Sequence, residues 1–332
     1  MKILITGGAG YIGSHTCVEL LNAGHEIIVI DNFSNSSTQV IESIKKITHQ
    51  AFIFYQGDVQ DENLLNKIFK EHKIDAVVHF AGFKAVGESV SNPLKYYQNN
   101  LLSTITLCQV MAQNNCFQLV FSSSATVYGK PRKLPIKETA PLKTTNPYGT
   151  TKLMIEQILG DLCVADERWG ITILRYFNPI GAHESGLLGD NPNQPNNLMP
   201  YVVKVATHEL PILNVFGNDF NTPDGTGVRD YIHVIDLAQG HLQALNKLKS
   251  NQGIKIYNLG TGKGYSVLEI IKTFEKVNKV KINYQIVERR AGDIDACYAD
   301  TSLAKKELSW QAKYDLNKMC QDAYNFVIKN NN

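Results

Sequence analysis

Three residues near the middle of the chain have the types and the spacing needed to move a proton to and from an alcohol. Tyr148 and Lys152 are four residues apart, so a helix that begins near Pro147 would carry both on one face. Ser124 ends an upstream β-like run. Lowering the pKa of a tyrosine from about 10 to near 7 costs roughly 4 kcal/mol, and neighbouring cations favour the phenolate. Ser124 can then hydrogen-bond the reacting oxygen, so the set predicts an alcohol dehydrogenation site.

A glycine-rich segment predicts the oxidant for that site. Gly8-x-Gly10-x-x-Gly13 follows a predicted strand and opens a predicted helix. Glycines there let the backbone approach a pyrophosphate at the helix N-terminus, whereas a lone glycine cluster often forms only a turn. Asp31 ends the second predicted strand and can accept hydrogen bonds from both ribose hydroxyls. Its charge would repel a 2′-phosphate, which favours NAD over NADP.

Two other features have competing interpretations. Asp58 follows the third predicted strand and could bond the adenine edge or cap a helix. Tyr314 and Lys318 repeat the Tyr-x-x-x-Lys spacing without a serine partner, so we interpret them as a solvated helix face.

The elements that position these residues alternate between β-branched runs and amphipathic stretches. This alternation predicts right-handed βαβ crossovers and an α/β, Rossmann-type doubly wound parallel sheet. The predicted strands are 2–6, 26–31, 52–56, 76–80, 118–122 and 172–176, and the predicted helices are 11–22, 61–72, 93–114 and 147–166.

The amino-acid composition of the chain changes after residue 178. Residues 178–230 are rich in Pro, Gly and Asn, which predicts long loops. We expect a dinucleotide-binding domain at 1–177 and a smaller, loop-rich α/β substrate domain at 178–332, with parts of 230–260 returning to the large domain. Beyond the loops we predict helices at 234–247 and 267–278 and strands at 255–259 and 281–287.

Composition narrows the possible partners. The 332 residues carry a formal net charge of +2 without a clustered basic stripe, so we expect no nucleic-acid partner. The six cysteines form no Cys-x-x-Cys pair and lie mostly in apolar runs, which predicts reduced, buried thiols and no metal site. Residues 2–6 already read as a strand rather than a secretory signal, and no apolar stretch could span a bilayer. We therefore expect a cytoplasmic protein without membrane partners.

Several longer motifs, taken in order, make the chain similar to the extended short-chain dehydrogenases/reductases, and within them to the UDP-galactose 4-epimerase family. They are TGGAGYIGSH (6–15), HFAGFKAVGESV (79–90), SSSATVYG (122–129), RYFNPIGAH (175–183), NNLMPY (196–201), FGNDF (216–220), DGTGVRDYIHV (224–234) and RRAGD (289–293). The resemblance covers essentially the whole chain.

The resemblance implies an isomerase with a tightly held, recycled NAD that interconverts UDP-galactose and UDP-glucose through a transient 4-keto sugar. Tyr148 would take the proton of the sugar 4-hydroxyl, with Ser124 and Lys152 as the other catalytic residues. The implied NAD contacts also include Gly7, Gly10, Tyr11, Ile12, Gly13, Asp31, Asn32, Phe33, Ser34, Asn35, Ser36, Asp58, Val59, Phe80, Ala81, Gly82, Phe83, Lys84, Asn99 and Phe177. The implied UDP-sugar contacts also include Ala125, Thr126, Asn178, Asn197, Leu198, Phe216, Arg229, Tyr231, Arg290, Asp293 and Cys297.

Two positions narrow the implied reaction. Ala125-Thr126 stands where the related 4,6-dehydratases carry an Asp-Glu pair, and without that extra acid and base, dehydration is disfavoured. Cys297 stands where relatives restricted to the plain hexoses can place a tyrosine. A small residue there predicts that UDP-GlcNAc and UDP-GalNAc are also substrates, and the alternative is a buried thiol without influence on selectivity. Arg229 and Arg290 suit diphosphate contacts, but taken alone they would be surface ion pairs.

The helices predicted at 93–114 and 147–166 carry more apolar positions than one sheet-facing stripe requires. Two such helices per chain could pair into an intersubunit four-helix bundle, which predicts a homodimer. Two other functions compete with the epimerase on this scaffold. One is a sugar-nucleotide dehydratase or NAD(P)-dependent reductase. The other is a non-catalytic NAD sensor, against which the intact Ser124, Tyr148 and Lys152 set argues.

Overall fold

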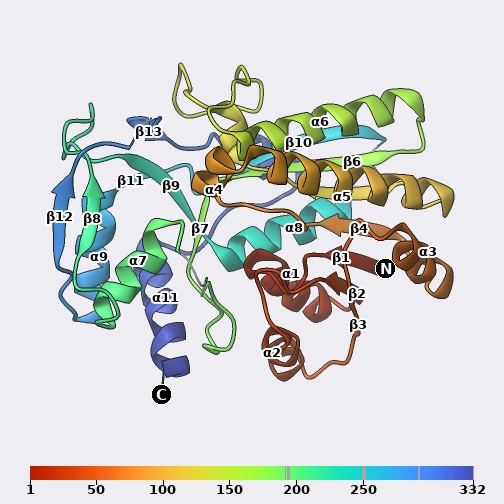
Figure 1. Ribbon diagram of the computed structural model, residues 1–332, viewed down its shortest axis with the longest axis horizontal. Helices are drawn as coiled ribbons and strands as arrows, with labels where there is room; N and C mark the ends of the chain where they lie inside the picture. Colours follow the sequence, from red (N-terminus) through yellow and green to blue (C-terminus); the bar gives the residue numbers. More distant parts are fainter. Residues whose placement is uncertain (191, 193–194, 249–251, 291, 332) are drawn as a thin grey trace.

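A seven-stranded, fully parallel sheet forms the centre of the larger part of the molecule (Figure 1). The computed structural model describes residues 1–190, 192, 195–248, 252–290 and 292–331, so Ala291 of the RRAGD motif lies outside the described residues. The strand order β10-β6-β5-β4-β1-β2-β3 reverses its direction between β1 and β4, which creates the crevice where ligands bind in such sheets. The strands are β1 Lys2–Thr6, β2 Glu26–Asp31, β3 Ile53–Gln56, β4 Ala76–His79, β5 Gln118–Ser122, β6 Gly170–Tyr176 and β10 Gly253–Leu259.

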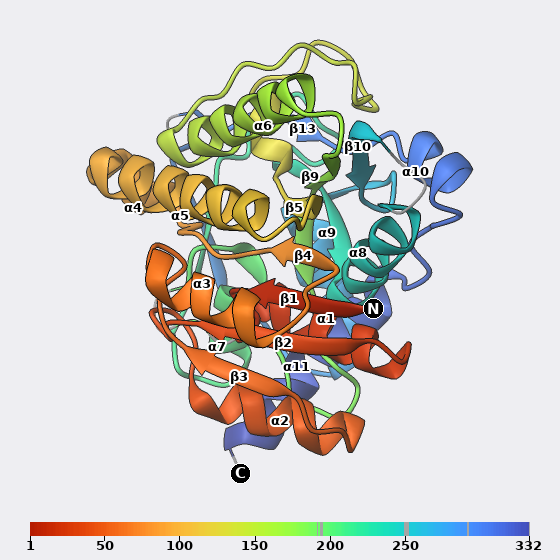
Figure 2. The same cartoon turned by 90° about the vertical axis from the view of Figure 1, so that its right-hand side faces the viewer.

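Helices cover both faces of this sheet, as the nearly continuous apolar strands require (Figure 2). One buried core packs α1, α2, α8 and α10 against one face, and a second packs α3, α5 and α6 against the other. The helices of this part are α1 Tyr11–Asn22, α2 Thr38–Thr48, α3 Glu62–Glu71, α4 Val86–Ser91, α5 Pro93–Gln113, α6 Pro147–Ala165, α8 Val234–Leu248 and α10 Ser302–Glu307, together with the 3₁₀ helix η1 Ala125–Tyr128.

A smaller part of the molecule lies beside the carboxyl ends of these strands (Figure 1). Its largest sheet has β9 at the centre, paired with β7, β11 and β13, and a separate pair joins β8 to β12. Three helices pack around a core that includes Tyr231, Phe274 and Met319. The elements are β7 Asn178–Ile180, α7 Leu198–Ala206, β8 Leu213–Phe216, β9 Val228–His233, β11 Gly264–Ser266, α9 Val267–Asn278, β12 Tyr284–Val287, β13 Ala296–Cys297 and α11 Leu316–Asn331.

The predicted fold class is confirmed, and the predicted strands and helices of the first half are present to within a few residues. The sequence analysis missed α2 between β2 and β3, although Ile41 and Ile44 form a buried stripe on it. The expectation of long loops across residues 178–230 was wrong in part, because β7, α7, β8 and β9 begin there. Residues 281–283 precede β12 rather than belong to it. β10 joins the large sheet beside β6, while the domain boundary at residue 177 stays a prediction.

The second Tyr-x-x-x-Lys copy is not a helix face, because α11 begins at Leu316, after Tyr314. The Tyr314 ring packs against the His233 ring at 4.5 Å between centroids, and Lys318 Nζ donates to Asp322 Oδ1 at 2.9 Å. Both residues therefore help to join the C-terminal helix to β9. Within the described part of the chain, no helix is long and apolar enough to cross a membrane.

Candidate active site

The carboxyl end of β5 and the first turns of α6 bring the three proton-transfer candidates to one edge of the sheet. Pro147 occupies the first turn of α6, and the Asn146 side chain caps it by accepting from Gly149 N at 2.8 Å. Tyr148 and Lys152 then lie one turn apart, both buried, with 6% of each residue exposed. Ser124 caps η1, and its Oγ accepts a hydrogen bond from Thr126 Oγ1 at 3.0 Å.

The electrostatics of this site show what the protein alone does to its acid and base. Burial raises the pKa of the Tyr148 phenol, as does Tyr176, whereas Ser124 acts in the opposite direction. Burial lowers the pKa of Lys152 to about 8, with Glu156 opposing that shift. Lys152 Nζ donates to Ser122 O at 2.8 Å. The protein by itself therefore does not make Tyr148 basic, and a cation besides Lys152, such as a bound oxidised nicotinamide, would be needed to favour the phenolate.

The glycine-rich loop between β1 and α1 has no side chains that would keep a dinucleotide away from its backbone. Gly7 has φ +68°, and a Cβ added there would lie 2.8 Å from Ala81 N. A Cβ on Gly13 would collide with the Gly7 carbonyl, so α1 could not begin so close to the loop with any larger residue. Gly10 precedes Tyr11 and Ile12 as the N-cap of α1 without any side-chain cap. The loop and the N-terminus of α1 therefore leave space, at positions that a Cβ would fill, that fits the pyrophosphate of NAD.

Asp31 lies beside this loop at the end of β2. Its Oδ2 accepts from Ala9 N at 3.0 Å, and its Oδ1 accepts from Phe33 N at 2.9 Å and from Ser36 Oγ at 3.0 Å. The carboxylate is thus fixed at the edge of the loop, as a ribose ligand must be. The remaining residues of this segment, Asn32, Ser34 and Asn35, follow it in the turn that precedes α2.

Asp58 contributes to the same edge and does not cap a helix. Its Oδ2 accepts from Asn32 Nδ2 at 2.9 Å, and its Oδ1 accepts from Gln60 N at 2.8 Å. The residue that caps α3 is Asp61, whose side chain accepts from Leu64 N. The interpretation of Asp58 as a helix cap is therefore wrong, while its bond to the adenine edge stays a prediction.

The other cofactor candidates come from the ends of β3, β4 and β6 and from α5. Residues Phe80, Ala81, Gly82, Phe83 and Lys84 follow β4, and Phe83 N donates to Asn100 Oδ1 at 2.8 Å. Asn99 Oδ1 accepts from Gln60 Nε2 at 3.2 Å, which connects α5 to the Asp58 turn. Val59 and Phe177 are buried. The parallel sheet thus brings to one edge residues that are far apart in the chain.

The substrate candidates gather around β9 in the smaller part of the molecule. Arg229 Nη1 donates to Val228 O at 2.8 Å and to Ile294 O at 2.9 Å. The Arg290 guanidinium lies 4.8 Å from the centroid of the Phe216 ring and pairs with Asp293 at 3.0 Å. Burial raises the pKa of Tyr231 to about 12, while Arg229 and Arg290 lower it, so the two guanidinium groups act on one phenol. The Arg290–Asp293 pair is itself the exposed ion pair of the alternative interpretation. Among the described residues, the hydrogen-bond partners of Arg229 are the backbone carbonyls of Val228 and Ile294.

Further substrate candidates connect this cluster to the proton-transfer residues. Asn178 pairs with Tyr231 between β7 and β9, and Cys297 pairs with Arg229 between β13 and β9. Cys297 also packs into the hydrophobic cluster that contains Phe177 and Ala125. Asn197 precedes α7 as its N-cap residue, and Leu198 begins that helix. Cys297 therefore lies between the arginine cluster and the turn that follows Ser124.

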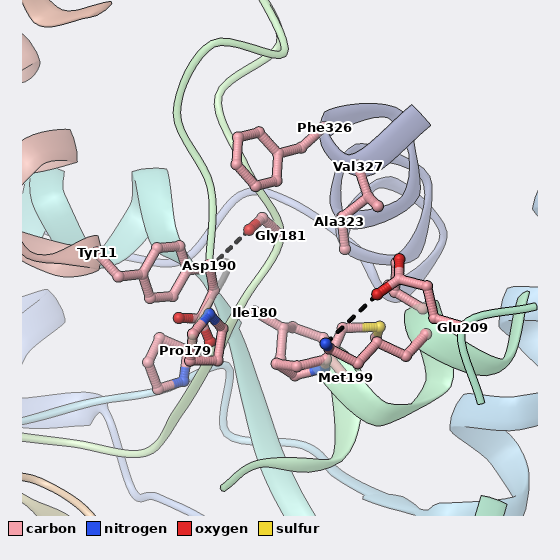
Figure 3. A pocket seen from close by; sticks show the side chains of 14 residues that line it. Tyr11, Pro179, Ile180, Gly181, Asp190, Met199, Glu209, Ala323, Phe326 and Val327 are labelled. Carbon is pink, nitrogen blue, oxygen red and sulfur yellow. Dashed lines mark hydrogen bonds and ion pairs between the residues drawn. The ribbon is translucent and has the colours of Figure 1, made fainter. Parts of the chain in front are cut away.

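A small cavity next to Tyr11 is not part of this site (Figure 3). It has a volume of about 30 Å³, and Tyr11, Asp190, Met199 and Phe326 are among the residues that line it. The Tyr11 hydroxyl donates to Gly181 O at 2.7 Å along its edge. Ser124, Tyr148 and Lys152 do not line it. It has room for about one water molecule, which is too little for a dinucleotide or a nucleotide sugar.

Two residues behind the site were missed from the sequence. Glu156 accepts from Ser123 Oγ at 2.5 Å and pairs with Arg175, whose Nη2 lies 2.6 Å from Glu156 Oε2. Both side chains are almost fully buried, at 5% and 2% exposure. Spacing could have indicated Glu156, which follows Lys152 by one more helical turn. Arg175 is the last residue but one of β6, and only the tertiary fold brings it to Glu156.

A lysine and a tyrosine one turn apart on a helix, a serine at the neighbouring strand end and a glycine-rich dinucleotide loop define an NAD-dependent enzyme of the extended short-chain dehydrogenase/reductase class. A family described as GDP-mannose 4,6 dehydratase matches residues 4–323. The chain is 57% identical to a UDP-glucose 4-epimerase of Bacillus subtilis (strain 168), over 100% of the chain and 98% of that protein. It is 58% identical to a UDP-glucose 4-epimerase of Haemophilus influenzae, with the same coverage.

The structure of the chain also superimposes closely on a solved structure of the same family of enzymes. The UDP-glucose 4-epimerase of Bifidobacterium longum in complex with NAD+ and UDP superimposes with a TM-score of 0.97 at 54% identity, covering 100% of this chain and 99% of that one. The chain therefore belongs to the UDP-glucose 4-epimerase family. Among the residues that the structure describes, no group of three or more His, Cys, Asp or Glu side chains could hold a metal ion.

Proposed function

We propose that this protein interconverts UDP-galactose and UDP-glucose through a transient 4-keto sugar, with NAD held and recycled in the site. One observation carries the proposal: Ser124, Tyr148 and Lys152 meet at the sheet edge next to a glycine loop and a fixed ribose-side carboxylate. The relatives that match over the full length are UDP-glucose 4-epimerases. Gly7, Gly10, Tyr11, Ile12, Gly13 and Asp31 would hold the cofactor, and the bound nicotinamide supplies a reversible acceptor for the hydrogen at sugar C4.

The catalytic residues divide the proton chemistry between them. Tyr148 removes the proton of the sugar 4-hydroxyl and later returns it, acting first as base and then as acid. Lys152 stays cationic beside it and favours the phenolate. Ser124 donates a hydrogen bond to the reacting oxygen, and the Thr126 hydroxyl orients Ser124 by donating to its Oγ at 3.0 Å.

The arginine cluster holds the other end of the substrate. Arg229 and Arg290 bind the diphosphate, and Phe216 and Tyr231 provide aromatic surface beside them. Asn178, Asn197, Leu198 and Asp293 complete the UDP side. Tight contacts to UDP and few directional contacts to the hexose let the keto sugar turn over, so that hydrogen returns to its opposite face.

Epimerisation explains the residues after Ser124 better than dehydration does. Elimination across C5 and C6 needs an additional acid and base, whereas Ala125 offers neither and the Thr126 hydroxyl is engaged with Ser124. The dehydratase description of the matching family thus reflects the shared scaffold.

The direct test is to incubate the purified protein with UDP-galactose and no added coenzyme, and to analyse the sugars formed. We expect UDP-glucose from the wild-type protein, and a Tyr148→Phe variant to lose roughly 100-fold or more in kcat because the base is gone. Tyr314→Phe is the matched control, since Tyr314 has the same Tyr-x-x-x-Lys context outside the site, and it should keep kcat. Full activity of Tyr148→Phe, or the absence of nicotinamide in protein that binds none when it is supplied, would refute the proposal.

The position of Cys297 supports acetylated substrates as well. Cys297 pairs with Arg229 and packs against the cluster of Phe177 and Ala125, so its side chain borders the proposed sugar position. Burial raises the pKa of its thiol to about 11, which excludes a ready nucleophile and leaves size as its contribution. A small residue here leaves room for the N-acetyl group of UDP-GlcNAc and UDP-GalNAc.

The corresponding substitution is Cys297→Tyr. We expect turnover of UDP-GalNAc to fall by about 10-fold or more while that of UDP-galactose stays within a few fold, because the larger ring fills the space of the acetyl group. The kcat/KM values for both sugars measure this, with Cys297→Ser as the size-matched control. Equal losses for both sugars, or no loss for either, would contradict the assignment.

The setting of the enzyme completes the proposal. We place it in the cytoplasm, where the six free cysteines stay reduced, and we assign it to carbohydrate metabolism with UDP-sugars as its partners. We assign NAD binding chiefly to residues 1–177 and UDP-sugar binding chiefly to 178–332, with α8, β10 and α10 returning to the NAD-binding part. Two copies associate through α5 and α6.

A further inference from the structure

Two hydrogen bonds join the end of β5 to α6, next to Ser124 and Tyr148. Lys152 Nζ donates to Ser122 O at 2.8 Å, and Ser123 Oγ donates to Glu156 Oε1 at 2.5 Å. Glu156 follows Lys152 by one helical turn, as Lys152 follows Tyr148. The two residues that precede Ser124 are therefore both attached to the helix that carries Tyr148.

Glu156 is itself fixed from a second strand. Arg175 Nε lies 3.1 Å from each oxygen of the carboxylate, and Nη2 lies 2.6 Å from Oε2, so the pair is bidentate. Arg175 Nη1 continues to the Tyr128 hydroxyl at 3.1 Å and to Glu138 O at 3.0 Å. A carboxylate held in this way cannot change rotamer without leaving a buried guanidinium unpaired.

We propose that Glu156 is a positioning residue for proton transfer, which rests on the proposed function: through its hydrogen bond with Ser123 it fixes Ser124 against Tyr148. The carboxylate does not touch the reacting groups. It acts through the strand end on one side and through one turn of α6 on the other. A buried ion pair is weak evidence for added stability, so a role in setting geometry and charge accounts better for its place here.

The charges around Lys152 predict how the pH dependence of the reaction changes when Glu156 is replaced. Glu156 on α6 opposes the effect of burial on the pKa of Lys152, and His79 on β4 faces Lys152 as a neutral ring because burial lowers its pKa to about 3. The other titratable groups around the site are Tyr148 on α6 and, acting on it, Tyr176 on β6 and Tyr96 on α5. Neutralising Glu156 leaves burial unopposed, so Lys152 should lose its proton at a lower pH.

The test compares Glu156→Gln and Ser123→Ala in the NAD-containing protein, with kcat and KM for UDP-galactose measured across pH. We expect kcat to fall about 10-fold or more in both, with KM within a few fold, because misplacement of Ser124 affects the transition state most. In Glu156→Gln the alkaline limb of the kcat profile should also move to lower pH. Ser123→Ala should leave that limb in place. Glu42→Gln, which removes an exposed carboxylate on α2, is the control and should change neither quantity.

Melting temperature and NAD content separate positioning from simple misfolding. If Glu156→Gln does not fold because Arg175 is left unpaired, the double variant Glu156→Gln/Arg175→Gln removes both buried charges and should still show the low kcat and the shifted limb. Wild-type kcat and an unmoved limb in a folded Glu156 variant, together with wild-type kcat in Ser123→Ala, would overturn the proposal. Inactivity of the wild-type protein toward UDP-galactose would instead refute the proposed function.

Discussion

At the scale of single residues, the site joins side chains one helical turn apart, Tyr148 and Lys152, to a buried ion pair, Glu156 and Arg175, that links a helix to a strand. Tyr148 and Lys152 are related by one helical turn, so a linear pattern could reveal them. The buried pair of Glu156 and Arg175 joins a helix to a strand and left no comparable signal. Nor could the sequence say that Lys152 Nζ bonds Ser122 O.

Lys152 predicts the alkaline limit of the reaction. Its pKa is lowered from 10.5 to about 8 by burial, and catalysis needs its charge, so kcat should fall as pH rises through about 8. The effect on stability has the opposite sign. Between about 8 and 10.5 the unfolded chain holds more protons at this residue than the folded one, so its contribution to stability rises with pH.

Measurements of kcat and of melting temperature over pH 6 to 10 separate these two effects. Above the pKa of Lys152 we expect kcat to fall roughly tenfold per pH unit. A kcat that stays constant to about pH 10, well above that pKa, would contradict the assignment. Lys152→Met should show low kcat without the alkaline limb.

At the scale of elements, periodic segments were predictable and irregular ones were not. The strands of the large sheet are short apolar runs, and their order follows from βαβ connections. In the Pro-, Gly- and Asn-rich region after residue 178, however, β7 and β8 have only three and four residues, and they exist because β9 and β12 pair with them. Such pairing is set by distant parts of the chain, so the local composition did not predict these strands.

The C-terminal helix offers a stability prediction at this scale. Asp322 on α11 accepts from His233 Nε2 at 3.1 Å and from Lys318 Nζ at 2.9 Å. Burial would raise the pKa of this carboxyl, but those two hydrogen bonds leave it lowered from 3.8. Its contribution is therefore complete above that ordinary value and is lost as pH falls through the folded pKa. Asp322→Asn should lower the free energy of unfolding by about 2–4 kcal/mol near pH 7.

Urea unfolding followed by circular dichroism measures the change. Asp219→Asn is the matched control, because Asp219 pairs with Arg289 on the surface with 69% of its side chain exposed, and we expect no measurable change there. Similar losses in the two variants would show that the His233–Asp322 contact does not stabilise the attachment of α11.

At the scale of the whole molecule, α5 and α6 lie side by side on one face of the large sheet (Figure 2). Several of their apolar side chains are exposed. Leu94 is 79% exposed, Val164 is 86% exposed, and Leu102 and Met154 are each more than a third exposed. A second copy of the same two helices would cover them by forming a four-helix bundle.

We therefore expect a dimer of 37.0 kDa chains in light scattering, and a monomer for the variant Leu102→Lys/Met154→Lys, because buried lysines would oppose the interface. Tyr284→Lys is the control: Tyr284 is similarly exposed on β12, away from these helices, and its loss should leave the dimer intact. A monomeric mass for the wild-type protein at working concentration would contradict the expectation.

The path of the chain between the two sheets has a further consequence. After β6 it enters the smaller sheet at β7 and β9, returns through α8 and β10, leaves again for α9 and β13, and comes back as α10 before it ends in α11. Neither half can therefore be excised as a continuous gene fragment, and one proteolytic nick would not release either. Any opening of the crevice must therefore move several of these connecting segments together.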